Sequence, residues 1–185
     1  MIQVRPSHRS ASNALQRGFT LVELVAVIIV MGILGAVGAS NFFDRDTFDS
    51  RAFGDETSAL MRYAQKLAIA QNREVFVHLQ ANRIALCYTD ACGAGSQVLA
   101  PGGTNNGSAT TTAACIDTTW ACAAPPPGIT LTTATAFYFD PMGRPFRQTD
   151  PLRTPNSTFA TLAVGVAGGA QLRTLTVEAE TGYVH

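Results

Sequence analysis

The hydrophobic pattern of the chain begins with one long apolar run near the N-terminus. Residues Phe19 to Ala39 contain 21 positions, and Glu23 is the only ionisable one among them. As a helix rising about 1.5 Å per residue, this run is about 31 Å long, which matches a hydrocarbon core of about 30 Å. The pattern therefore predicts a membrane-spanning helix over residues 19–39.

A second pattern, with helical spacing, follows this run. Good helix formers dominate from Thr57 to Gln71. Positions on one side recur at intervals of three, four or seven residues: Phe53, Leu60, Tyr63, Ala64, Leu67, Ala68 and Gln71. This spacing predicts an amphipathic helix over about residues 51–72 that packs on its own domain. The polar stretch 41–50 is predicted to be either a solvated turn or a frayed part of one continuous helix.

The rest of the chain, residues 74–185, is rich in strand formers separated by turn residues. The runs that predict strands are 74–79, 83–89, 129–131, 135–139, 158–166 and 171–178, with a last short pairing over 183–185. The turn signals between them are 80–82, 140–145, 167–170 and 180–182. One long N-terminal helix followed by such strands predicts an α+β fold, in which the helix packs on an antiparallel β-sheet.

Residues 90–128 do not fit either period. Gly, Thr and Pro predominate there, and the four cysteines Cys87, Cys92, Cys115 and Cys122 lie inside this segment or beside it. Four cysteines allow three pairings, and the spacings favour Cys87–Cys92 and Cys115–Cys122, each stabilising by about 2 kcal/mol. The spacings fit zinc knuckles poorly. We therefore expect a variable loop ordered by disulfides, with Trp120 packed under it rather than presented to a partner.

Charge indicates how the apolar run is oriented. Arg5, Arg9 and Arg17 precede it, and no acidic residue does. By the positive-inside rule, residues 1–18 stay in the cytoplasm and residues 40–185 are exported as a globular domain. Three of the 13 basic residues lie before the run and one of the 13 acidic residues is Glu23, which leaves 10 basic and 12 acidic residues in the exported part.

These charges and motifs exclude several function classes. A slightly acidic exported part does not form a basic nucleic-acid footprint, and its one basic cluster, Arg144, Arg147 and Arg153, is small. The chain contains neither G-x-S-x-G nor H-E-x-x-H. His78 is a lone histidine in a predicted strand and fits a cross-strand role better than a ligand role. We expect no enzyme activity, no cofactor and no metal site.

The residues Arg17-Gly18-Phe19-Thr20-Leu21-Val22-Glu23 resemble the type III signal of type IV prepilins and pseudopilins. The resemblance implies that prepilin peptidase cuts between Gly18 and Phe19 and methylates the new amino terminus of Phe19. It also implies that Glu23 neutralises the amino terminus of an adjacent subunit during assembly. Two alternatives remain open: a signal peptide cut near Ala39, and an uncleaved signal anchor. Neither accounts for Glu23 or for Gly18-Phe19.

The downstream half is similar to the GspH/FimT-type minor pilins and pseudopilins. The similarity lies in segments 62–65, 68–71, 139–144 and 180–183. Segments 48–71 and 178–185 further resemble the minor prepilins of mannose-sensitive haemagglutinin (MSHA) pilus operons. These resemblances imply a type IV pilin-like fold and a low-abundance subunit that promotes pilus assembly.

The same resemblances imply partners and a location. The implied partners are prepilin peptidase, other major and minor pilins, and the membrane. The implied location is the bacterial inner membrane, crossed once with the C-terminal domain in the periplasm, and afterwards the pilus. Two alternative functions remain open: a type II secretion pseudopilin, and a pilus tip subunit that binds a ligand or DNA.

Overall fold

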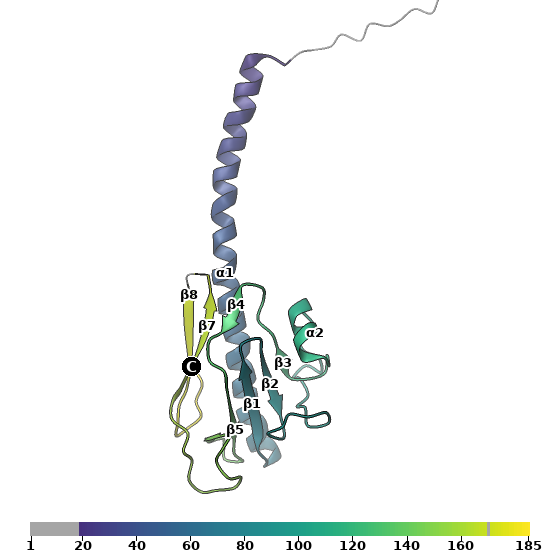
Figure 1. Ribbon diagram of the computed structural model, residues 1–185, viewed down its shortest axis with the longest axis vertical. Coiled ribbons are helices and arrows are strands. Elements are labelled where there is room, and N and C mark those ends of the chain that lie inside the picture. The colour runs from purple at the N-terminus through teal and green to yellow at the C-terminus, as the bar shows by residue number, and fades with distance from the viewer. Residues whose placement is uncertain (1–18, 170) are drawn as a thin grey trace, which may run out of the picture. The chain divides into compact units, whose positions relative to one another are not determined.

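The computed structural model describes residues 19–169 and 171–185, and for residues 37–44 it describes the backbone alone. The predicted leader 1–18, including Gly18, lies outside the described residues. The chain divides into two compact units, Met1–Phe42 and Phe43–His185. Helix α1, Leu21–Gln71, contributes its first part to one unit and its second part to the other (Figure 1). The polar stretch 41–50 is helical throughout, so of the two alternatives the structure shows one continuous helix and not a turn.

The membrane-spanning prediction covered residues 19–39. Within the part of the chain that the structure describes, no helix is both long and apolar enough to cross a membrane. Residues 37–39 belong to the stretch for which only the backbone is described.

In the second unit, α1 buries one face against the sheets. The most deeply buried apolar residues on this face are Phe53, Met61, Ala64 and Ala68, each at most 2% exposed. Small residues at Ala64 and Ala68 let the helix axis approach the strands closely. Met61 was not among the predicted inward positions, although it lies one turn before Ala64. The prediction that Gln71 faces inward is wrong: its side chain is exposed, because α1 ends there.

The described residues contain eight strands, which form two antiparallel sheets. The larger sheet has the order β3-β2-β1-β5-β6, and the smaller one has the order β4-β7-β8. The strands of the larger sheet are β1 Val75–Gln80, β2 Arg83–Cys87, β3 Cys122–Ala123, β5 Thr135–Phe139 and β6 Pro145–Arg147. Those of the smaller sheet are β4 Ile129–Leu131, β7 Leu162–Gly168 and β8 Gln171–Val177.

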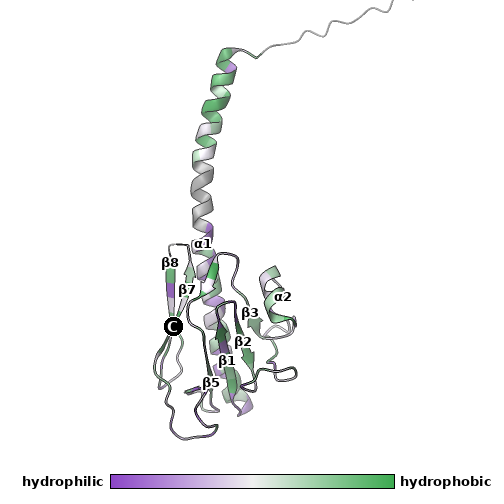
Figure 2. Cartoon of the chain, in the orientation of Figure 1, coloured by the Kyte–Doolittle hydropathy of each residue, from purple (hydrophilic) through white to green (hydrophobic). Residues whose placement is uncertain are grey.

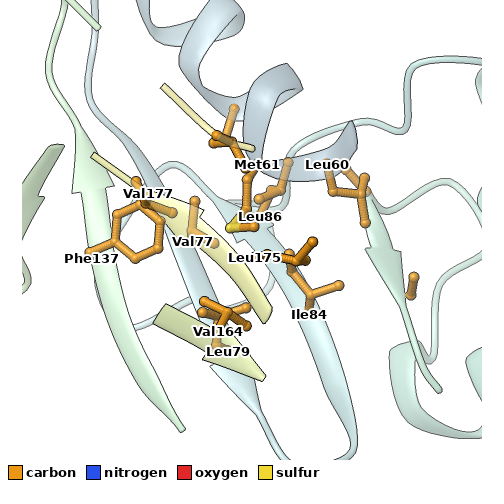
Figure 3. Close-up of a cluster of buried hydrophobic side chains, with 14 of the residues drawn as sticks. Leu60, Met61, Val77, Leu79, Ile84, Leu86, Phe137, Val164, Leu175 and Val177 are labelled. Carbon is orange, nitrogen blue, oxygen red and sulfur yellow. The ribbon is translucent and has the colours of Figure 1, made fainter. Parts of the chain in front are cut away.

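One hydrophobic core joins both sheets to α1 in this unit. Figure 3 shows side chains from α1, the larger sheet and the smaller sheet converging on it. Leu60 and Met61 come from α1, Val77, Leu79, Ile84, Leu86 and Phe137 from the larger sheet, and Val164, Leu175 and Val177 from the smaller one. In β1 the alternation of Val75, Val77 and Leu79 directs one side of the strand into this core. The predicted fold, a long N-terminal helix packed on antiparallel strands, is confirmed.

The structure differs from the prediction in three details. The strands form two sheets rather than one, because β4 pairs with β7 and not with the β1–β2 hairpin. Residues 158–161 lie outside β7, which begins at Leu162. Residues 140–145 were predicted to be a turn, but Pro145 opens strand β6, which was not predicted. Its missing N–H costs little there because this strand lies at the edge of the sheet.

Polar side chains of α1 hold the C-terminal tail against the helix. The guanidinium of Arg62 donates two hydrogen bonds to the carbonyl of Val184, at 3.0 and 2.9 Å. The side-chain amide of Gln65 donates to the carbonyls of Gly143 and Thr181, both at 2.8 Å. Val184 also pairs with Val177 of β8, which is the last short pairing predicted from the sequence.

Candidate functional site

The start of α1 is capped by the residues of the prepilin-like signal. Thr20 precedes the helix, and its hydroxyl oxygen accepts the backbone N–H of Glu23 at 3.3 Å. The carbonyl of Thr20 accepts the N–H groups of Glu23 and Leu24, at 3.1 and 3.2 Å. Thr20 therefore acts as the N-cap, and Glu23 occupies the third helical position, where a carboxylate interacts favourably with the helix dipole.

The first part of α1 exposes apolar side chains around its whole circumference. Phe19, two residues before the helix begins, is 79% exposed, and even the least exposed large apolar residue of this part of the helix, Val25, is 45% exposed. Figure 2 shows this part of the helix as predominantly hydrophobic. The exposed apolar residues are Phe19, Leu21, Val22, Leu24, Val25, Val27, Ile28, Ile29, Val30, Met31, Ile33 and Leu34.

Such a surface is unstable in water by itself. An apolar helix without a polar face is normally covered by lipid or by other helices. The side chain of Glu23 lies within this surface and is exposed. The helix therefore offers an apolar contact surface with a single anionic position near its beginning.

The segment after β2 is ordered by two disulfides. Cys87 is joined to Cys92 and Cys115 to Cys122, with Cα atoms 5.3 and 5.9 Å apart. These are the two short-range pairs that the spacings favoured. Within the predicted loop 90–128, the second disulfide links the end of helix α2, Ala109–Cys115, to strand β3. Sequence reasoning predicted neither element.

Trp120 anchors this segment on the larger sheet. Its ring is 3% exposed, and its indole N–H donates to the carbonyl of Leu86 at 2.7 Å. The guanidinium of Arg83 lies 5.4 Å from the centre of the Trp120 ring and donates to the carbonyl of Ala114 at 2.8 Å. The prediction that Trp120 packs under the segment is confirmed, and this ring is unavailable to a partner.

His78 lies beside the first disulfide. A ring nitrogen of His78 and the Sγ atoms of Cys87 and Cys92 all lie within 4.8 Å of one another, a distance at which three such atoms could hold a metal ion. Both sulfurs are bonded to each other, so neither is a thiolate ligand in this structure. On β1, His78 faces Ala85 and Ala136 across the sheet, as expected for a cross-strand residue. Burial lowers the pKa of His78. The negative charge of Asp90 opposes this effect, and the positive charge of Arg83 adds to it.

The three arginines of the basic cluster have different surroundings. Arg144 forms an ion pair with Asp140 at 2.9 Å, and Arg153 lies 3.8 Å from the carboxylate of Glu74. The charge of Arg144 is therefore compensated within the chain, and that of Arg153, whose side chain is 87% exposed, is compensated only weakly. An arginine that is already paired contributes less to binding a phosphate backbone, so the geometry does not favour DNA as a ligand.

Two residues with well-defined polar contacts, Asp150 and Glu56, were not predicted from the sequence. Asp150 accepts hydrogen bonds from the backbone N–H groups of Arg147 and Thr158 and from the Thr158 hydroxyl. Glu56 accepts a hydrogen bond from the side-chain amide of Asn106 at 2.8 Å. The contact between Glu56 and Asn106 joins residues fifty positions apart, and no local pattern in the sequence signals it.

Comparisons with known proteins agree with the N-terminal signal. Residues 13–39 match the family model described as the prokaryotic N-terminal methylation motif. Over 59 residues the chain is 37% identical to the type IV narrow pilus major component PilA5 of Thermus thermophilus. That match covers 32% of this chain and 51% of PilA5, so this chain spans about half the length of that relative.

The structure is similar to two crystal structures of the type IV minor pilin FimU from Pseudomonas aeruginosa PAO1. The first has a TM-score of 0.45 and 11% identity, and covers 77% of this chain and 90% of FimU. The second has a TM-score of 0.43 and 12% identity, and covers 73% of this chain and 90% of FimU.

The segment that matches the methylation motif, residues 13–39, includes Gly18, Phe19 and Glu23.

Proposed function

We propose that this chain is a minor pilin, a low-abundance subunit that is built into a type IV pilus and promotes its assembly. Prepilin peptidase removes residues 1–18 and methylates the amino group of Phe19. The observation that carries the proposal is the exposed apolar start of α1, which contains Glu23 as its one carboxylate. The match of residues 13–39 to the methylation motif, which covers the same segment, supports the proposal. An MSHA-type pilus is the filament that best fits the resemblance of segments 48–71 and 178–185.

Before assembly, the apolar segment 19–39 is held in the bacterial inner membrane, and residues 40–185 lie in the periplasm. The arginines before the segment favour this orientation. A carboxylate in a membrane helix costs up to about 2.5–3.5 kcal/mol at the bilayer centre and less towards an end. Glu23 is near one end of the segment, so the membrane tolerates it while favouring a state in which it is paired.

Assembly supplies the partner for Glu23. Cleavage after Gly18 creates an amino group on Phe19, and a neighbouring subunit presents the same group at a similar depth. An ion pair between Glu23 of one subunit and this amino group of the next offsets the desolvation of both charges. The apolar side chains of adjacent helices then cover one another. Because only one register brings the charges together, Glu23 also determines the axial position of the subunit.

Replacement of Glu23 tests this mechanism. In cells that assemble the pilus, Glu23→Ala and Glu23→Gln are expected to reach the inner membrane at the wild-type level but to be lost from sheared filaments. Glu23→Gln retains the size of the side chain, so its loss of incorporation isolates the charge. The matched control is Glu180→Gln, an exposed glutamate of the second unit, which is expected to enter filaments normally. Normal incorporation of Glu23→Gln would contradict the pairing mechanism.

A further inference from the structure

A pocket of about 290 Å³ lies between α1 and the loop that follows Ala100. Helix α1 contributes Glu56, Ala59 and Leu60, residues of the loop 100–106 form the opposite wall, and Ala121 and Cys122 complete the lining. This volume is close to the lower end of the range of about 300–1,000 Å³ that is usual for small-ligand sites. Most of the lining is apolar, and Glu56 is the one charged residue in it.

The loop that closes this pocket is held by specific hydrogen bonds. The Asn105 side-chain amide donates to the carbonyl of Asp117 at 3.0 Å, and the Asn105 backbone N–H donates to the carbonyl of Thr118 at 2.7 Å. On the helix side, the Tyr63 hydroxyl donates to the carbonyl of Leu99 at 3.1 Å. The wall opposite Glu56 is therefore preorganised, which lowers the conformational cost of binding a ligand there.

Glu56 is an anionic group without a countercharge inside this pocket. It is half-buried, and its Oε1 atom accepts the side-chain amide of Asn106 at 2.8 Å. Among the residues that the structure describes, no cation forms an ion pair with it. Burial raises the pKa of Glu56, and the Asn106 hydrogen bond only partly opposes this effect. A carboxylate in such surroundings is stabilised by a cation that also covers the apolar lining.

We infer that this pocket binds an alkylammonium group, with Glu56 as its counterion and Asn106 as the residue that orients the carboxylate. An ammonium group donates to the Glu56 carboxylate, while its alkyl stem lies against Ala59, Leu60 and Pro101. A divalent metal ion fits less well because it requires about six oxygen ligands and the pocket offers one carboxylate. The inference concerns the second unit alone and does not depend on pilus assembly.

The test is a titration of the full-length, isotope-labelled protein in detergent micelles, followed by NMR. The probe is n-butylammonium chloride, and the signals are the Asn106 side-chain amide and the backbone amides of residues 100–106. Saturable shifts confined to these groups are expected. Sodium chloride controls for ionic strength, and n-butanol has the same stem without the charge. No saturable shift with n-butylammonium, or equal affinity for n-butanol, would overturn the inference.

A variant of the counterion makes the test specific. Glu56→Gln retains the shape of the side chain and its acceptor for Asn106, and it is expected to weaken n-butylammonium binding by about tenfold or more, since a charge-assisted contact is lost. Glu180→Gln makes the same chemical change at an exposed site and is expected to bind as wild type does. Unchanged affinity in Glu56→Gln, with the wild-type spectrum elsewhere, would show that Glu56 is not the counterion and would refute the inference.

A second probe distinguishes the two sources of the ammonium group. Nα-acetyl-lysine N′-methylamide carries the same stem and charge on a peptide backbone. If it binds as tightly as n-butylammonium, the pocket is open enough for the lysine side chain of a protein partner. If only n-butylammonium binds, the ligand is a free small amine.

Discussion

Gly182 shows how a single residue position depends on contacts that are distant in sequence. Its φ angle is +65°, a backbone conformation that residues other than glycine rarely adopt. A Cβ atom built there would lie 2.6 Å from the carbonyl oxygen of Gly143 and 2.8 Å from the side-chain nitrogen of Gln65. The sequence indicated a turn over 180–182 but not the reason why glycine is required at its end.

We predict that Gly182→Ala lowers the free energy of unfolding by about 3 kcal/mol, because left-handed backbone strain adds to a clash with the Gly143 backbone. Urea unfolding monitored by circular dichroism measures the change. Gly102→Ala is the matched control, since a Cβ at Gly102 meets no atom within 4 Å. Equal stability of the two variants would show that the tail has room for a side chain.

Asp150 predicts a pH dependence of stability. Burial alone would raise its pKa, but the hydrogen bonds from Thr158 and Arg147 outweigh burial and lower the pKa below the usual value of 3.8. A carboxyl group whose pKa is lower in the folded state stabilises the fold above its unfolded pKa, and this stabilisation is lost as the pH falls through the folded value. The relevant window therefore lies below the usual pKa of an aspartate.

We predict that Asp150→Asn lowers the free energy of unfolding by about 2 kcal/mol near neutral pH, because charge-assisted hydrogen bonds are lost. Urea unfolding of variant and wild type should show this difference at about pH 7 and a smaller one at about pH 3, which lies below the usual aspartate pKa, where part of the stabilisation is lost. A difference that stays constant over this range would mean that the charge of Asp150 makes no contribution.

At the scale of elements, local patterns predicted most of the fold. The hairpin β1–β2, strands β4, β5 and β8, and the C-terminal pairing follow from strand formers bounded by turn residues. Helix α2 was missed because three consecutive threonines, Thr110 to Thr112, have low helix propensity. Its one local signal was Ser108, whose hydroxyl caps the helix by accepting the N–H of Thr111 at 3.2 Å.

Sites that depend on distant contacts were the least predictable. The signal around Gly18, Phe19 and Glu23 is contiguous, so its residues could be found in the sequence. The pocket at Glu56 and the tail contact of Arg62 join residues 50 and 122 positions apart, respectively. Spacing and composition carry no information about such pairs, because these contacts form only when the loop 100–106 and the C-terminal tail fold back onto α1.

The Cys115–Cys122 disulfide carries a prediction for α2. Removing it with the double variant Cys115→Ser/Cys122→Ser should lower the free energy of unfolding by about 2.5 kcal/mol, the chain-entropy value for a loop of this length. Amide hydrogen exchange should become faster in α2 and β3 while β1 keeps its protection. If α2 stays protected in the double variant, the hydrogen bond between the Thr111 hydroxyl and the Ala124 N–H is sufficient to hold it.

At the scale of the whole molecule, the two units have different requirements. Residues 43–185 bury their own hydrophobic core, and hydrogen bonds within this unit hold its C-terminal tail and turns. The first part of α1 buries none of its large apolar side chains within the described chain. A chain that combines a self-sufficient unit with an apolar helix that needs external cover is suited to the assembly that we propose, first with lipid and then with other subunits.

The proposed function requires that the chain is processed as a prepilin. The most direct test is the intact mass and N-terminal residue of the protein purified from the membranes of its native cells, with and without prepilin peptidase. We expect a mature chain that begins at N-methylated Phe19 when the peptidase is present and an unprocessed chain when it is absent. A chain that begins at Ser40 in both strains, as after ordinary signal peptidase cleavage, would show that it is not a prepilin, and so would an intact Met1 in both.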